Sequence, residues 1–323
     1  MIWVGWRQQR VETLIAAAML AVLAGVAIPV GVHMASVYSH EGLAACAGSA
    51  NPAACANSLG SFQLRFNGLN VLFTWSTIVP ALAALLLAAP FLADLDNGTY
   101  RLYWTQSITR RRWIVTKLTL SVVASVAVAG CLIALATWAR APLDHLNGRM
   151  STNAYDTEGI VPVAYALFVL GVAVAIGALW RRTVPALLVA FAVYVVGRAF
   201  MDSWLRQRLL SPVKTTWLAN GSVSGPNLNQ ALVINQFISD KNGHELAGFP
   251  GPAGPCIRSS GALFSHVSRC AQPQALGTHV YMTAVYQPAS RFWELQGLEF
   301  GIVAGIGMLL VLAAAWWANR RIA

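Results

Sequence analysis

Long apolar runs separated by polar stretches dominate the chain. Six of these runs reach about 20 residues, the length a helix needs to cross the hydrocarbon core of a bilayer. They cover residues 14–34, 71–93, 114–138, 160–179, 184–201 and 298–318. A helix satisfies its own backbone hydrogen bonds, so it can lie in lipid where an open loop cannot. The pattern therefore predicts an all-α integral membrane protein with six transmembrane helices, forming one domain over residues 1–323.

Composition agrees with a membrane location. Hydrophobic residues make up 57% of the chain and charged residues only 11%, whereas soluble domains carry roughly 25% charged residues. The formal net charge is +10, which raises the question of nucleic-acid binding. The basic residues lie mainly at the ends of the apolar runs, as membrane topology requires, so we expect no nucleic-acid partner.

Basic residues also predict the orientation. They gather in the loop after the second run, in the short link Arg181-Arg182, and near both termini. With six spans, all of these segments lie on one side of the membrane, which the positive-inside rule places in the cytoplasm. The sequence thus predicts a multi-pass protein of the plasma membrane with cytoplasmic N- and C-termini.

Four of the five cysteines fall in the two segments predicted to be external. Cys46 and Cys55 lie between the first two runs, and Cys256 and Cys270 lie in the long segment 202–297. Because an oxidising exterior favours disulfides, we predict the pairs Cys46–Cys55 and Cys256–Cys270, with four free thiols as the alternative. Segment 202–297 is too long for a bare connection, so we expect an external cap, partly irregular and stapled by the second disulfide.

Catalytic and metal-binding motifs are not found in the sequence. It contains no Gly-x-x-x-x-Gly-Lys-Ser/Thr phosphate loop, no His-Glu-x-x-His helix and no Cys-x-x-Cys pair, so we expect neither an enzyme nor a metal site. A few charged residues lie near the outer ends of the last two runs and are candidates for an external gate or interface. Arg198 and Asp202 are four residues apart and can meet on one helix face. The others are Arg291, Glu294 and Glu299.

The loop after the second run carries a resemblance to a known family. It includes Gly98-Thr99, Arg101-Leu102, Trp104-Thr105-Gln106-Ser107, Thr109-Arg110 and Trp113, with Lys117 following. This pattern resembles the corresponding loop of ABC-2 type transporter permeases, especially the actinobacterial type found in high-GC Gram-positive bacteria. Asp94 and Asp96 stand where the family usually has glutamates, which shortens the reach of both carboxylates. The stretches 6–10 and 286–296 resemble the same family.

The resemblance implies a fold and a role. It implies six spans of the type V exporter kind, two permeases per transporter (economically a homodimer), and a separate ABC ATP-binding subunit that holds ATP and Mg. No cofactor is then expected in this chain. The partner subunit is expected to dock on loop 94–113. The implied coupling residues are Asp94, Asp96, Gly98, Thr99, Arg101, Trp104, Thr105, Gln106, Arg110, Arg111 and Arg112.

The resemblance also bears on the direction of transport and on the substrate. Most such systems resemble exporters, so efflux of an unidentified small molecule or peptide is the expectation. The alternative is a stand-alone membrane immunity or sensor protein that binds a ligand through its large external loop. An ATPase that co-purifies with the chain separates the two.

Overall fold

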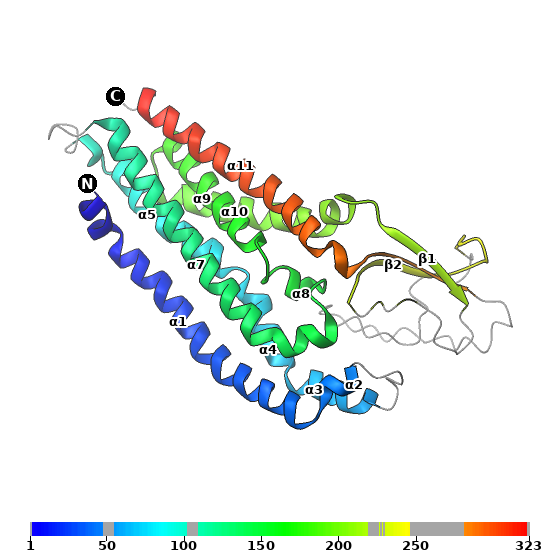
Figure 1. Ribbon diagram of the computed structural model, residues 1–323. Coiled ribbons are helices and arrows are strands. Elements are labelled where there is room, and N and C mark those ends of the chain that lie inside the picture. Colours follow the sequence, from blue (N-terminus) through cyan, green and yellow to red (C-terminus); the bar gives the residue numbers. More distant parts are fainter. Residues whose placement is uncertain are drawn as a thin grey trace.

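The computed structural model shows a bundle of long helices with a small sheet at one end (Figure 1). It describes residues 2–47, 55–101, 109–218, 226, 228, 230–245 and 281–321. The N- and C-terminal ends of the first and last helices lie together at one end of the bundle, which we call the termini end. The opposite end, which carries the strands, is the sheet end.

Among the described residues, six helices are long and apolar enough to cross a membrane, in agreement with the six predicted spans. Several continue beyond the predicted limits, because polar residues at both bundle ends also adopt helical conformation. The spans are Gln9–His40, Asn67–Asp96, Arg110–Asn147, Val161–Trp180, Thr183–Arg208 and Ala289–Arg320.

The first half of the chain contributes three spans and the short helices between them. The long helices are α1 (Ile2–His40), α5 (Val79–Asp96) and α7 (Arg110–Asn147). At the sheet end, α2 (Leu43–Ala47) and α3 (Ala56–Arg65) lead from α1 to α4 (Asn67–Ser76), which forms the second span together with α5. A single turn, α8 (Thr152–Tyr155), leads from α7 towards the next span.

The second half contributes the other three spans, α9 (Val161–Trp180), α10 (Thr183–Phe200) and α11 (Phe292–Arg321). A π-helical turn, η2 (Met201–Leu205), and a 3₁₀ turn, η3 (Arg206–Arg208), extend α10 at the sheet end. A second 3₁₀ turn, η5 (Ala289–Arg291), precedes α11.

Helix α9 lies at the centre of the bundle and packs against α5, α7, α10 and α11. Its contact with α11 depends on two glycines. A Cβ atom at Gly171 would lie 2.2 Å from the carbonyl oxygen of Gly307, so only glycine permits this approach. Close backbone contact through small residues is a usual way for membrane helices to associate. By contrast, α1 and α10 expose much of their apolar surface, as helices facing lipid or a partner do.

The segment predicted as an external cap contains three antiparallel strands, β1 (Val213–Leu218), β2 (Leu232–Ser239) and β3 (Tyr281–Gln287). Their order in the sheet is β1-β3-β2, so the last strand pairs with both others. The hydroxyl of Thr283 in β3 bonds to Thr216 at 2.8 Å and to Ser239 at 2.7 Å, which ties all three strands together. These strands were not among the predicted elements.

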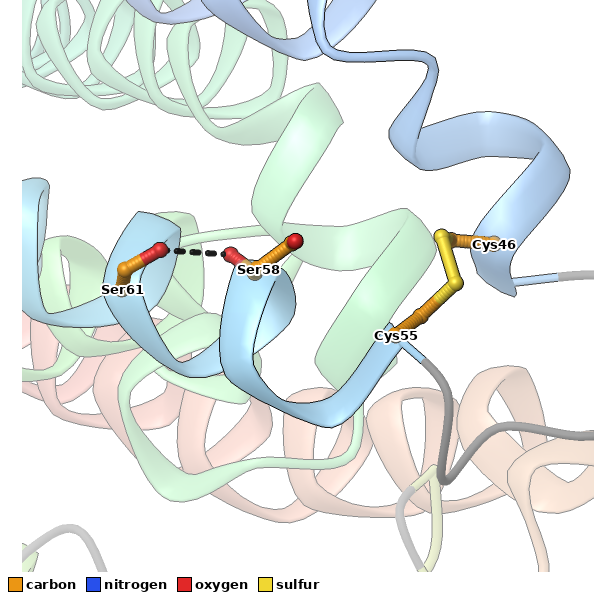
Figure 2. The surroundings of a disulfide bond; sticks show 4 residues. All are labelled: Cys46, Cys55, Ser58 and Ser61. Carbon is orange, nitrogen blue, oxygen red and sulfur yellow. Dashed lines mark hydrogen bonds between the residues drawn. A yellow bond between two sulfur atoms is a disulfide. The ribbon is translucent and has the colours of Figure 1, made fainter.

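The structure contains the predicted disulfide between Cys46 and Cys55 (Figure 2). It joins α2 to the start of α3, and the two Cα atoms are 5.8 Å apart. Cys131 is free and exposed on α7. The predicted partners Cys256 and Cys270 lie outside the described residues.

Non-reducing peptide mapping should recover Cys46 linked to Cys55 and Cys256 linked to Cys270. Replacing Cys46 and Cys55 together by serine should lower the free energy of unfolding by about 2–3 kcal/mol, because the bond closes a short loop. A Cys131→Ser variant is the matched control and should unfold like the wild type. Free thiols at positions 46 and 55 in protein taken directly from cells would contradict the first pairing.

Candidate functional site

The loop that carries the family resemblance begins at the termini end, where α5 stops. Gly98 follows the helix with φ of +68°, a left-handed conformation that glycine adopts at little cost. The chain then turns, and Thr99 and Arg101 start the loop towards α7. Residues 102–108, which include Trp104, Thr105 and Gln106, lie outside the described part of the chain.

Asp94 fixes the start of this loop against α7. Its Oδ2 atom lies 2.8 Å from Nζ of Lys117, and its Oδ1 atom accepts a hydrogen bond of 2.8 Å from the Thr99 hydroxyl. The Lys117 side chain is only 4% exposed, so the ion pair is largely removed from solvent. An ion pair with both a close cation and a second donor is a favourable arrangement for a buried carboxylate.

Asp96 fixes the same segment against α10. Its Oδ2 atom accepts a hydrogen bond of 2.9 Å from the backbone N–H of Thr183, the first residue of α10. A carboxylate at this position satisfies a free helix N–H and interacts favourably with the helix dipole. The turn before Thr183 is tight, because Arg181 adopts a left-handed conformation with φ of +53°. The aspartates at positions 94 and 96 therefore reach their partners despite being shorter than glutamate.

The first turn of α7 combines a buried aromatic contact with an exposed basic rim. Phe91 of α5 and Trp113 of α7 stack with ring centroids 5.5 Å apart, and both side chains are buried. Arg110, Arg111 and Arg112 are exposed. We call residues 94–117 the coupling segment, of which 94–101 and 109–117 are described. Asp94 and Asp96 link its start to α7 and α10, and its arginines face outward.

A second feature is an apolar cavity of about 370 Å³ at the surface of the bundle, between α1, α5 and α10. Its lining is entirely hydrophobic and comprises Met19, Leu82, Leu85, Leu86, Leu187, Leu188 and Phe191.

At the sheet end, Arg206 lies at the centre of a buried cluster of charges. Its guanidinium contacts Asp156 at 2.7 Å, Asp202 at 2.6 Å and Glu299 at 3.0 Å. The prediction that Arg198 pairs with Asp202 is wrong. Arg198 binds Asp156 at 2.8 Å, and Asp202 binds Arg206, because the loop before α9 places a second carboxylate between the two arginines.

Aromatic and amide groups complete this cluster. The Tyr165 hydroxyl donates to Glu299 at 2.9 Å, and the Tyr155 ring lies 4.3 Å from the Arg206 guanidinium. Burial raises the pKa of Tyr155, so its hydroxyl stays protonated. Gln296 accepts hydrogen bonds of 3.0 Å from the N–H groups of Ile160 and Val161, which anchors the start of α9 to α11.

Two of the predicted external charges lie away from the cluster. Arg291 donates to the carbonyl of Ser211 at 2.7 Å and to the side chain of Gln287 at 3.0 Å, which ties the start of α11 to the sheet. Glu294 is exposed. Sequence reasoning missed Asp156, Arg206 and Gln296, although the charged residues near the ends of apolar runs were a usable signal for the first two.

The described residues form six apolar helices of spanning length, and side-chain contacts fix a loop at the termini end. These features are those of a multi-pass membrane protein with a candidate docking surface. The sequence model of the ABC-2 membrane transporter related family matches residues 17–206, more than half of the chain. The chain therefore belongs to this family and is a transporter membrane subunit of the ABC-2 permease type. The match ends at Arg206, before the sheet and the last span. No curated protein and no solved structure matches the chain significantly.

Proposed function

We propose that this chain is the membrane subunit of an exporter driven by a separate ABC ATP-binding subunit. The partner docks on the coupling segment from the cytoplasmic side, and ATP and Mg are bound by the partner. ABC-2 permeases in general work with such a subunit, which supports a partner of this class. A second copy of the chain completes the transporter as a homodimer.

The observation that carries this proposal is the double attachment of the coupling segment. Asp94 links it to α7 and Asp96 links it to α10, through contacts of 2.8 and 2.9 Å. A partner that pushed on the loop would therefore move two spanning helices at once.

The apolar cavity between α1, α5 and α10 supports an apolar or amphipathic substrate. Two of its three walls, α5 and α10, are the helices joined by Asp96. Movement of the coupling segment would thus alter the relative positions of the cavity walls. Substrate entry from the bilayer is consistent with a lining that lacks polar residues.

A Trp104→Ala variant should bind the ATPase subunit about thirtyfold more weakly, since loss of a buried aromatic anchor costs about 2 kcal/mol or more at an interface. Arg110→Glu should have a smaller effect that depends on salt, because exposed charges act mainly on association. The measurement is ATPase-subunit affinity and substrate-stimulated ATP turnover in reconstituted membranes.

Trp3→Ala is the matched control, since Trp3 is an exposed tryptophan near the N-terminus and lies outside the coupling segment. Wild-type affinity and turnover in both the Trp104→Ala and the Arg110→Glu variants would disprove docking at this segment. Failure to recover any ATPase with the wild-type chain would favour the stand-alone sensor instead.

The orientation is tested by thiol labelling of intact cells. Cysteines placed at Asn97 and Thr183, at the termini end, should be protected from a membrane-impermeant reagent. A cysteine at Asn242, in the exposed turn after β2, should react. Labelling of position 97 from outside would reverse the orientation and place the coupling segment on the wrong side for an ATPase.

A further inference from the structure

The loop between α7 and α9 buries a second group of charges, separate from the three carboxylates around Arg206. Asp144 near the end of α7 has a side chain that is 8% exposed, and the side chain of Glu158 is 1% exposed. Both carboxyl groups face the guanidinium of Arg140, whose Nε lies 3.1 Å from Glu158 and whose Nη2 lies 3.8 Å from Asp144. Two buried acidic groups that share one cation repel each other unless one of them carries a proton.

The nearby cations favour Glu158. Nε of Arg140 lies 3.1 Å from Oε1 of Glu158, and Nε of Arg149 lies 3.4 Å from Oε2. Arg140 also forms an ion pair with Asp144, but a longer one. Its Nη1 donates to Asn70 at 2.8 Å, while its Nη2 stays 3.8 Å from Asp144, too far for a hydrogen bond.

Asp144 is consequently a buried carboxyl group without a donor. Both of its oxygens are inaccessible to solvent and have no hydrogen-bond partner among the described residues, and the same holds for Oε2 of Glu158. If both groups were ionised, two acceptors would face each other with no hydrogen between them. A proton on one group converts this repulsion into an O–H···O bond, as in other close pairs of carboxyl groups.

We propose that Asp144 is a proton-binding site, whose carboxyl group carries a proton in the folded protein and donates it to Oε2 of Glu158. Both guanidinium groups contact Glu158 more closely, which leaves Asp144 as the carboxyl group without a hydrogen-bonded cation. On release, the O–H bond of Asp144 breaks, the proton passes to water, and two adjacent carboxylates remain. A metal ion fits less well, because the described residues contain no group of three or more His, Cys, Asp or Glu side chains that could hold one.

The other titratable groups around this pair are engaged elsewhere. His145 of α7 stacks on Tyr38 of α1, and His33 of α1 contacts Arg65 of α3. Asp156, in the same loop as Glu158, binds Arg198 and Arg206. Besides Glu158, the charged groups that act on Asp144 are Arg140 and Arg149.

Proton release should therefore loosen the sheet end. The backbone carbonyl of Glu158 accepts a hydrogen bond of 3.3 Å from Gln296 of α11, so repulsion at Glu158 strains the link between α9 and α11. The protonated pair is the more stable form. Stability contributed by the pair is present at low pH and is lost as the pH rises through its deprotonation.

Infrared spectroscopy of the full-length protein in lipid nanodiscs tests the proposal. The wild type should show the carbonyl band of a protonated carboxylic acid at neutral pH, and the band should disappear as the pH is raised. Carbon-13 labelling of aspartate carboxyl groups should shift this band in the wild type, which assigns it to aspartate without any substitution. Asp144→Asn should abolish the band and remove the fall in Tm that the wild type shows at high pH.

Asp240→Asn is the matched control, since Asp240 lies in an exposed turn and bonds to the backbone N–H of His244 at 2.8 Å. That contact lowers the pKa of Asp240, so the control should leave the band unchanged. The assignment would be overturned if the band of the labelled protein stayed at the frequency of the unlabelled protein, or if the band persisted in Asp144→Asn. If Asp144→Asn does not fold, the absence of a shifted band from the labelled wild type would still overturn the proposal.

Discussion

Replacing Arg206 by methionine should lower the stability of the protein strongly, and more than replacing Lys117 by methionine. Arg206 is 3% exposed and contacts Asp156, Asp202 and Glu299. Removing one partner of a buried ion pair typically costs about 3–5 kcal/mol, because the remaining charge is left without compensation. Here three carboxylates would lose a common cation, and only Arg198 would remain nearby.

The loss should appear as a large fall in Tm in detergent and as opening of the sheet end to proteases. Arg206 joins three parts of the chain that are distant in sequence, namely the loop before α9, the extension of α10 and the start of α11. Their separation would release α11 from the rest of the bundle at this end. Arg206→Lys should give an intermediate result, since one ammonium group keeps the charge but not the planar fork.

Arg208→Met is the matched control for this substitution. Arg208 lies two residues further along the same segment, is exposed, and places its guanidinium 4.4 Å from the Trp204 ring. Exposed substitutions of this kind change stability by about 0.5 kcal/mol or less. Adding Glu299→Gln to Arg206→Met should recover part of the loss, because it removes one of the unpaired charges. Equal Tm values for the Arg206→Met and Arg208→Met variants would show that the cluster contributes no stability.

The six spans were predictable because lipid imposes one simple requirement on them. A helix of about 20 apolar residues satisfies its backbone without water, and that signal is visible in each run separately. The extension of α10 to Arg208 lacks this apolar signal. Its polar residues are stabilised by contacts with Asp156 and Glu299, which lie 50 and 93 residues away in sequence.

The sheet and the sheet-end cluster depend on the same kind of distant contact. Strand β3 pairs with β1 across a long interval of sequence, and no local pattern specifies that partner. The i,i+4 spacing of Arg198 and Asp202 indicated a pair, but spacing along one helix carries no information about the loop that supplies Asp156. The Cys46–Cys55 disulfide was easier to predict, because the two residues are only 9 apart and no competing cysteine is near.

The coupling segment was identified by family resemblance and not by physical pattern. Its basic residues alone fit the positive-inside rule as well as they fit a docking surface. The contacts of Asp94 and Asp96 add what the sequence could not provide, which is a physical connection from this segment to two spans. Asp96 and Thr183 are 87 residues apart, so their contact exists only in the folded chain.

Lys117→Met should uncouple the transporter, because it removes the cation that holds Asp94 against α7. The two side chains are 4% and 14% exposed, so the unpaired Asp94 should cost about 3 kcal/mol, near the lower end of the range for buried pairs. The cost is local to the termini end, where only the Thr99 hydroxyl would still bind Asp94. The spans should still insert, since their apolar faces are unchanged, but force applied to the loop would reach α7 less directly.

The measurement is substrate-stimulated ATP turnover of the reconstituted complex, compared with its basal turnover. Lys117→Met should lower the stimulation while the basal rate persists, and Lys241→Met, in the exposed turn at the sheet end, should change neither. Asp94→Asn combined with Lys117→Met should be less damaging than the sum of the two single changes, since the double variant leaves no unpaired charge. Full stimulation in Lys117→Met would mean that Asp94 and Lys117 stabilise the loop without transmitting motion. Additive effects would mean that the two side chains act independently, in spite of their 2.8 Å contact.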